Sequence, residues 1–235
     1  MANNEHRRGY QPSDEKELRE DIELLRTAVR DVKYLLDAGY PIKNIMTFVG
    51  NHYLLSERQR MAVARSAASE QQIRGRKNRE LKPEQLYGQT IHIDGFNTII
   101  SLEIAFSGST LLKCMDGTIR DLAGLRGSYR LIDKTDLALN GIRHALERWN
   151  VSGACFYLDA PVSNSGRLKT KIAEVFQGST ISLDIRIIQD VDRELMEHDF
   201  VITSDSQILD HCGNWYNLAE DVIKAEMGAY RYVEV

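Results

Sequence analysis

The sequence lacks the features that would tie it to a membrane, a disulfide scaffold or a zinc cluster. No apolar run approaches the roughly 20 residues of a membrane span, and the polar start, residues 1–9, lacks the apolar core of a signal peptide. The three cysteines, Cys114, Cys155 and Cys212, are far apart and in no CxxC spacing. Such cysteines are typical of reduced thiols. We therefore expect a cytoplasmic protein with no membrane partner.

Several common enzyme motifs are also missing. The chain has no GxxxxGK sequence of a nucleotide-binding P-loop and no HExxH sequence of a zinc protease. The run Cys114-Met115-Asp116-Gly117-Thr118 resembles the end of the haloacid dehalogenase phosphatase motif. Because Cys114 stands where that family has its nucleophilic aspartate, the phosphatase class is not favoured.

Composition is that of a globular protein and gives no global sign of nucleic-acid binding. The 235 residues are 43% hydrophobic and 27% charged, with a formal net charge of −4. This length allows one large domain, or one of ordinary size with a small one. The distribution of charge along the chain is therefore more informative than its sum.

Residues 10–80 predict an all-helical N-terminal domain of three main helices. Asp14 with Glu17, and Ser56 with Gln59, have the spacing of capping boxes at helix starts. A glycine and a proline, at positions 39 and 41, separate the first helix from the second. One apolar stripe with intervals of three or four comprises Leu18, Ile22, Leu25, Val29, Val32 and Leu36.

The end of the third helix and the linker after it are basic. A local patch of this kind can neutralise nucleic-acid phosphates, but a solvated helix face followed by a soluble linker explains the same residues equally well. Pro83 and Gly88 mark the junction to a second domain at 88–235. The candidate phosphate-binding residues of this region are Arg58, Arg60, Arg65, Arg74, Arg76 and Lys77.

From Thr90 onward, short β-rich runs alternate with helical segments, which predicts an α/β domain with a doubly wound, mostly parallel sheet. The expected strands lie near 90–93, 110–115, 154–158, 183–188 and 200–203. The expected helices lie near 97–107, 134–149, 165–177, 191–197 and 205–211.

Three of these strands end in an aspartate: Asp94, Asp159 and Asp205. The carboxyl ends of parallel strands meet at one sheet edge, where open α/β folds build their sites. Asn97 and Ser204, beside two of these aspartates, would orient a water or a phosphate. The alternative is that each polar residue only caps a helix or forms a turn.

Clustered carboxylates repel one another, and one or two Mg²⁺ or Mn²⁺ ions would relieve that repulsion. Such ions polarise a phosphate and activate a water, so no nucleophilic Ser or Cys is needed. Asp136, in the first turn of a predicted helix, is the candidate for a fourth metal ligand. Arg167 and Lys169, at the start of another helix, are candidates for phosphate contact.

Three segments resemble the PIN and NYN-type ribonuclease domains: Asp94-Gly95-Phe96-Asn97 after its strand, 134–139, and 201–206. The whole chain also resembles an uncharacterised prokaryotic family in which a small helical domain of unknown function precedes a PIN-like domain. The resemblance implies a PIN-like fold that cleaves RNA with Mg²⁺ or Mn²⁺, with Asp94, Asp136 and Asp205 as ligands. It also implies pairing into a homodimer. Ser206-Gln207 departs from the second aspartate often found in NYN-type domains.

The sequence therefore predicts a metal-dependent nuclease that hydrolyses RNA at an acidic site, with Asp94, Asp136, Asp159 and Asp205 as ligands. The alternative is a catalytically inactive PIN-like module that binds RNA or acts as a scaffold. Convergence of the four aspartates within one coordination shell would distinguish the two.

Overall fold

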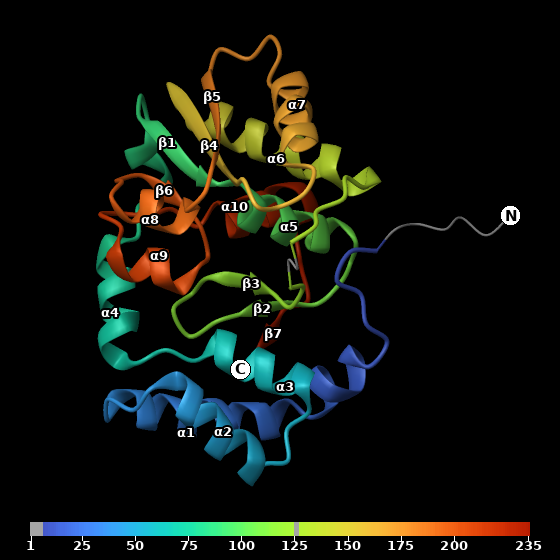
Figure 1. Ribbon diagram of the computed structural model, residues 1–235, viewed down its shortest axis with the longest axis vertical. Coiled ribbons are helices and arrows are strands. Elements are labelled where there is room, and N and C mark those ends of the chain that lie inside the picture. The colour runs from blue at the N-terminus through green and yellow to red at the C-terminus, as the bar shows by residue number, and fades with distance from the viewer. Residues whose placement is uncertain (1–6, 125–126) are drawn as a thin grey trace, which may run out of the picture.

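A computed structural model describes residues 7–124 and 127–235 (Figure 1). The chain begins with helices and continues into an α/β region, as predicted. The N-terminal elements are a π-helical turn, η1 (Glu15–Glu20), and four α-helices: α1 (Ile22–Asp37), α2 (Ile42–His52), α3 (Glu57–Ser66) and α4 (Glu70–Arg79). None of the helices in these described ranges is long and apolar enough to cross a membrane.

Two capping boxes set the starts of α3 and α4. Ser56 accepts a hydrogen bond from the Gln59 amide at the start of α3, as the sequence predicted. Ser69 and Gln72 form a second box at the start of α4, where the sequence analysis had placed a linker. That helix has no apolar stripe, and its one buried residue is Arg76. Hydrophobic periodicity could therefore not reveal it.

The main sheet has four parallel strands in the order β5-β4-β1-β6. After a short helical turn, η2 (Pro83–Leu86), these strands are β1 (Thr90–Asp94), β4 (Gly153–Asp159), β5 (Ser182–Ile188) and β6 (Val201–Ile202). The chain steps outward from β1 to β4 and β5, and then crosses to the other side of β1 for β6. The strand order therefore reverses between β1 and β6, and this reversal is a topological switch point.

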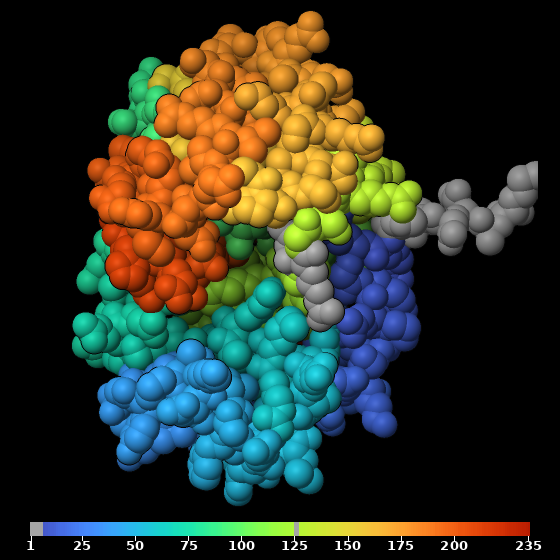
Figure 2. Space-filling model, in the orientation of Figure 1, coloured from blue at the N-terminus to red at the C-terminus, as the bar shows by residue number. Residues whose placement is uncertain are grey.

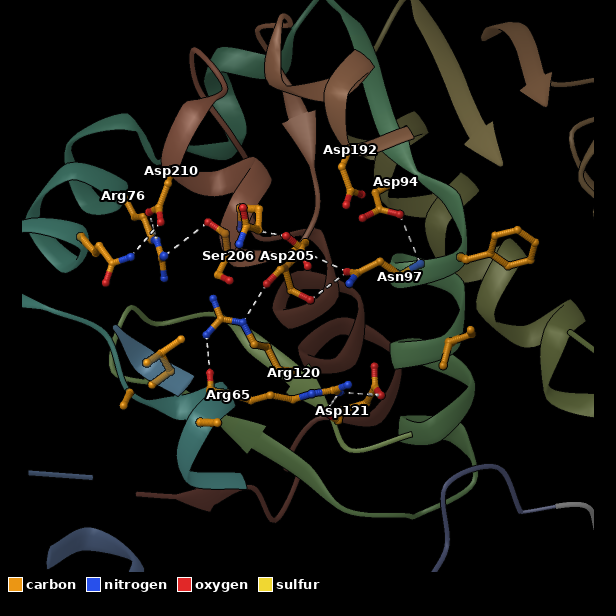
Figure 3. A pocket seen from close by; sticks show the side chains of 18 of the residues that line it. Arg65, Arg76, Asp94, Asn97, Arg120, Asp121, Asp192, Asp205, Ser206 and Asp210 are labelled. Atoms are coloured by element: carbon orange, nitrogen blue, oxygen red, sulfur yellow. Dashed lines mark hydrogen bonds and ion pairs between the residues drawn. The ribbon is translucent and has the colours of Figure 1, made fainter. Parts of the chain in front are cut away.

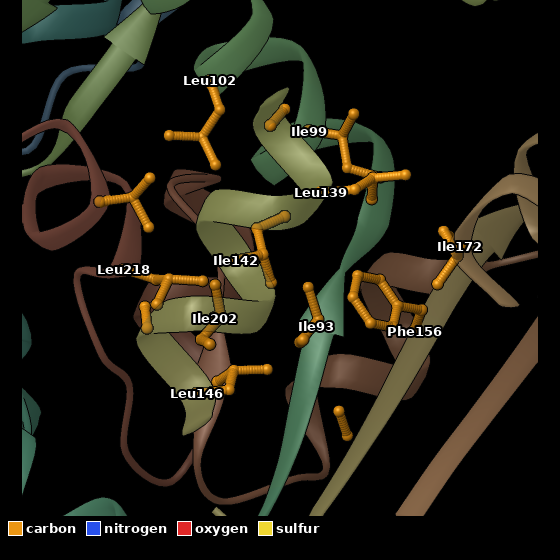
Figure 4. Close-up of a cluster of buried hydrophobic side chains, with 14 of the residues drawn as sticks. Ile93, Ile99, Leu102, Leu139, Ile142, Leu146, Phe156, Ile172, Ile202 and Leu218 are labelled. Carbon is orange, nitrogen blue, oxygen red and sulfur yellow. The ribbon is translucent and has the colours of Figure 1, made fainter. Parts of the chain in front are cut away.

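Helices cover both faces of the main sheet, which confirms the doubly wound prediction. One face packs on α5 (Gly95–Phe106), α6 (Asp133–Arg148), α7 (Ser165–Val175) and α10 (Leu218–Met227). Figure 4 shows Ile93 and Phe156 of the strands against Ile99 and Ile142 of the helices. The other face packs on α8 (Val191–Met196) and α9 (Ser206–His211). Strands buried on both faces explain the nearly continuous apolar runs in the sequence.

A second, mixed sheet joins the two parts of the chain. Its order is β3-β2-β7, with β2 (Leu111–Lys113), β3 (Ile119–Asp121) and β7 (Val233–Glu234). The expected strand at 110–115 therefore belongs to this sheet and not to the main one. Leu112, Leu122 and Val233 of this region share one apolar core with Leu25 and Val29 of α1. The N-terminal helices are thus packed against the α/β region through the small sheet.

Candidate active site

A cavity of about 670 Å³ opens at the carboxyl ends of β1, β4 and β6. Figure 2 shows it as a hollow between the N-terminal helices and the region of α8 and α9. Its lining comes from both parts of the chain, including Ile42 and Arg65 from the helical part and Asp94 from the end of β1. The cavity therefore lies at the switch point, where open α/β folds bind their ligands.

Asp94 is the last residue of β1 and is only 6% exposed. Its carboxylate accepts hydrogen bonds from the Thr203 hydroxyl at 2.8 Å and from the backbone N–H of Asn97 at 3.4 Å. Burial raises the pKa of Asp94 to about 7, and the charges of Asp205 and Asp192 add to the rise. The two hydrogen bonds favour the charged form and offset only part of this shift.

Gly95, directly after Asp94, permits the close approach of the start of α5 to β4. A Cβ at this position would lie 2.5 Å from a methyl of Leu158 and 2.8 Å from the Tyr157 carbonyl oxygen. The glycine of the Asp94-Gly95-Phe96-Asn97 motif is therefore required by packing under the carboxylate.

Asn97, in the first turn of α5, is bonded to Ser204 in the segment after β6. The Asn97 side-chain oxygen accepts hydrogen bonds from both the amide and the hydroxyl of Ser204, at 3.0 and 2.8 Å. Asp205 follows and accepts from the Gln207 amide at 2.7 Å, as the N-cap of α9. These bonds hold the acidic residues at the ends of β1 and β6 on the same cavity.

Asp159 and Asp192 complete the acidic side of the cavity. Burial raises the pKa of Asp159, and the charge of Asp190 contributes. Burial also raises the pKa of Asp192, with contributions from Asp205 and Asp159. The sequence analysis did not identify Asp192, although β5 is followed by Gln189-Asp190-Val191-Asp192. The same pattern of a strand followed by an acid could have revealed it.

Of the four carboxylates predicted for the site, the structure brings three to the cavity: Asp94, Asp159 and Asp205. Asp136 is the exception. It lies on the exposed surface of α6, and its carboxylate is 3.1 Å from the ammonium of Lys171 on α7. Asp136 is not among the residues that line the cavity, so the structure does not bring it to the other three aspartates.

The predicted basic patch divides into buried and exposed side chains. Arg58 is buried and pairs with Asp14 through two hydrogen bonds of 2.8 Å. Arg76 is 1% exposed and pairs with Asp116 and Asp210. Their N–H groups serve the protein itself, so the prediction that they bind RNA is revised.

The other cations of the predicted patch differ in their surroundings. Arg60 donates to the carbonyls of Leu55 and Met46 at the end of α2. Two are surface residues that pair with nearby glutamates, Arg74 with Glu70 and Lys77 with Glu80. Arg65 lines the cavity, with 35% of its side chain exposed. Arg76 also lines the cavity, but it is buried and paired, so Arg65 is the member of the patch that presents a partly exposed side chain to the candidate site.

The two residues of α7 that were predicted to contact phosphate lie outside the cavity lining. Arg167 is exposed on α7, and Lys169 donates a hydrogen bond of 2.9 Å to the Ile185 carbonyl of β5. Lys169 therefore fastens its helix to the edge strand, and its predicted contact with phosphate has no support from this geometry.

The donor chemistry of the acidic side suits a hard divalent cation, because its donors are carboxylate, amide and hydroxyl oxygens. Within residues 7–124 and 127–235, no group of three or more acidic, histidine or cysteine side chains encloses a metal site. Mg²⁺, however, is commonly held by one or two carboxylates together with waters and substrate phosphates. The residues present fit this open mode of binding, and the expected four-aspartate cage is not preassembled.

The fold and the cavity define an α/β protein with an acidic cleft at its switch point. Residues 83–221 match a family described as a domain of unknown function (DUF5616), and the chain belongs to this family. Residues 24–79 match a second family, described as a protein of unknown function (DUF434).

A relative from Methanocaldococcus jannaschii, the uncharacterized protein MJ0935, is 36% identical over 185 residues. The match covers 79% of this chain and 88% of that protein. No solved structure matches the chain. The comparisons thus match two successive parts of the chain to two families of unknown function and make no PIN assignment.

Proposed function

We propose that this protein is a metal-dependent phosphodiesterase that hydrolyses RNA. The observation that carries the proposal is the convergence of Asp94, Asp159, Asp192 and Asp205 on one cavity. Within the described part of the chain, none of the four is seen in an ion pair, and the pKa of Asp94 is raised to about 7. Carboxylates held close together without cationic partners repel one another, and a bound divalent metal ion would relieve that repulsion.

Each part of the acidic side has a distinct role in this proposal. Asp94 and Asp205 would hold the metal, because the end of β1 and the segment after β6 are joined through Thr203, Ser204 and Asn97. Asp159 and Asp192 flank them and add negative charge. A bound Mg²⁺ or Mn²⁺ would polarise the scissile phosphate and lower the pKa of a water.

The opposite side of the cavity supports a nucleotide as the substrate. Figure 3 shows Arg65 and Asp121 across the cavity from Asp94 and Asp192. The exposed part of Arg65 would contact a phosphate. Around it lies an apolar surface for a base, formed by Leu36, Ile42, Ala64 and Ala67. The cavity volume also lies within the roughly 300–1,000 Å³ of small-molecule sites.

The resemblance of the strand ends at Asp94 and Asp205 to PIN and NYN-type ribonuclease domains supports the same proposal. It favours RNA among phosphodiesters and a metal-activated water as the nucleophile. The departure at Ser206 and Gln207 removes the second aspartate often found in NYN-type domains, and it therefore argues against a second metal ion and favours the inactive module.

A second candidate is an inactive RNA-binding or scaffold module. The observation in its favour is that Asp94 and Asp205 also serve as N-caps of α5 and α9. Such caps stabilise a helix whether or not a metal binds. The two functions therefore have to be separated by a metal-binding measurement.

The test is calorimetric titration of Mn²⁺ into the parent protein, Asp94→Asn and Asp136→Asn, followed by an RNA-cleavage assay. Asp136→Asn is the matched control, because it makes the same substitution at an aspartate outside the cavity. We expect the parent and Asp136→Asn to bind Mn²⁺ and cleave RNA, and Asp94→Asn to do neither. Absence of Mn²⁺ binding by the parent would favour the inactive module.

A further inference from the structure

Two buried arginines hold the backbone on both sides of Asp205. Arg120, on β3, donates from Nε to the Ser204 carbonyl at 2.7 Å. Arg76, on α4, donates from Nη2 to the Ser206 carbonyl at 3.3 Å and from Nε to Asp210 at 2.7 Å. The carbonyls of the residues before and after Asp205 are therefore bonded to two other elements (Figure 3).

Asp116 joins the two arginines. Its Oδ2 lies 2.6 Å from a guanidinium nitrogen of Arg76 and 2.6 Å from one of Arg120. Its Oδ1 accepts from the Thr118 amide and hydroxyl. Burial opposes ionisation of Asp116, but the Arg120 charge, the Thr118 hydroxyl and the Arg76 charge together hold its pKa below the ordinary value. The cluster of Arg76, Asp116 and Arg120 is thus charged, buried and bonded in one arrangement.

The main sheet alone holds this part of the chain weakly. The strand before Asp205, β6, has two residues, and α9 after it has six. Arg120 also donates to the Arg65 carbonyl at 2.6 Å, so one side chain contacts both the acidic loop and the backbone of the cavity-lining Arg65. The cluster therefore relates the two sides of the cavity to each other.

We propose that Arg76 and Arg120 are positioning residues that hold the Asp205 carboxylate at the cavity, with Asp116 as their common anchor. Arg76 belongs to the N-terminal helical part, so that part completes the acidic site and is more than a neighbour of it. The effect of this positioning on metal binding rests on the proposed function; the positioning itself does not.

Arg79 provides a matched control on the same helix. It also joins α4 to α9, but it donates to the Cys212 and Leu209 carbonyls at the far end of α9, at 2.6 and 2.8 Å. A merely structural role for α4 arginines would make Arg76 and Arg79 equivalent. A positioning role confines the effect on the site to Arg76 and Arg120.

The first measurement is Mn²⁺ affinity in Arg76→Lys, Arg120→Lys and Arg79→Lys, with thermal unfolding as a check that each variant folds. Lysine keeps the charge beside Asp116 but lacks the planar fork that bonds several acceptors at once. We expect the first two variants to bind Mn²⁺ about 10- to 100-fold more weakly, as found for residues that orient metal ligands. Arg79→Lys should bind as the parent does. Equal weakening in all three variants would overturn the proposal.

The second measurement needs no metal. The amides of Gln207 and Ile208 donate to Asp205, so their hydrogen exchange reports how firmly that side chain is held. We expect faster exchange at both amides in metal-free Arg76→Lys and Arg120→Lys, and parent-like exchange in Arg79→Lys. Unchanged exchange in the first two variants would overturn the positioning. If the parent binds no Mn²⁺, the proposed function fails, and this exchange pattern still decides the positioning.

Discussion

Asp94 and Asp116 are both buried aspartates near the same cavity, yet their pKa values are shifted in opposite directions. Asp94 is 6% exposed and Asp116 is 4% exposed. The pKa of Asp94 is raised to about 7, whereas the pKa of Asp116 is lowered. Asp116 has two guanidinium partners, while Asp94 has a hydroxyl, an amide and two acidic neighbours. Burial is therefore common to both, and the partners decide the outcome.

The same contrast separates two regions of the molecule. The acidic side of the cavity concentrates charge that the described protein leaves unpaired. In the cluster of Arg76, Asp116 and Arg120, both arginines pair with the buried carboxylate, so they are not free to bind a phosphate. A region with unbalanced buried charge is a candidate for binding a ligand of the opposite sign, whereas a balanced region is a candidate for structural support.

The largest effect on stability is expected for Asp116→Asn. This change leaves Arg76 and Arg120 buried with one fewer negative charge, and breaking a buried ion pair in this way costs about 3–5 kcal/mol. Urea denaturation of the variant and the parent at pH 7 measures the difference. A loss below about 1 kcal/mol would contradict the view that partners, and not burial, set the state of Asp116.

A smaller effect of opposite sign is expected for Asp94→Asn without metal. The folded-state pKa of Asp94, about 7, lies above its ordinary value of 3.8, so the folded protein retains a proton that the unfolded chain releases. The parent should therefore lose stability as pH rises from about 4 to 7, and Asp94→Asn should avoid this loss. At pH 8 the variant should be more stable by roughly 2–4 kcal/mol.

Denaturation of metal-free parent and Asp94→Asn at pH 5 and pH 8 tests this prediction. The two proteins should differ clearly more at pH 8 than at pH 5. An equal pH dependence of stability in both proteins would show that the pKa of Asp94 is not raised in the folded state. Saturating Mn²⁺ should stabilise the parent alone, because ligand binding to the folded state adds to stability.

The smallest effect is expected for Asp192→Asn. Asp192 raises the pKa of Asp94 through its charge, so its removal should lower the Asp94 pKa. Mn²⁺ affinity should also fall, by roughly tenfold, the lower end for residues that support a metal site. Carboxyl NMR titration and calorimetry measure the two changes. An unchanged Asp94 pKa would place Asp192 outside the acidic group.

Strand-end aspartates were predictable because a local pattern determines them. An apolar run followed by Asp, as at Asp94, Asp159 and Asp205, identifies the carboxyl end of a parallel strand, and the topology then brings such ends together. The same pattern gives no information about Asp136, which lies on helix α6. The direction of a side chain on that helix depends on how the helix packs against α7. A strand followed by acidic residues also occurs at β5, where Asp192 is the second residue of α8, but the sequence prediction did not include it.

Basic residues were much less predictable than acidic ones. Arg58, Arg65 and Arg76 belong to one basic stretch of sequence, and each is in an ion pair, but Arg58 and Arg76 are buried whereas Arg65 is partly exposed at the cavity. Their partners, Asp14, Asp121 and Asp116, lie 40 or more residues away in the chain. Sequence spacing therefore contains no information about which arginine finds a carboxylate.

The amino-acid sequence by itself determined the helical start, the alternation of strands and helices, and the acidic ends of three strands. These features follow from periodicity and capping, which act over a few residues. Only the tertiary structure decided that the helical part forms one side of the cavity and that Arg76 and Arg120 hold the loop of Asp205. It also decided that the pKa of Asp94 is raised while that of Asp116 is lowered. Those outcomes depend on burial and on partners distant in the chain, which are established only when the chain packs.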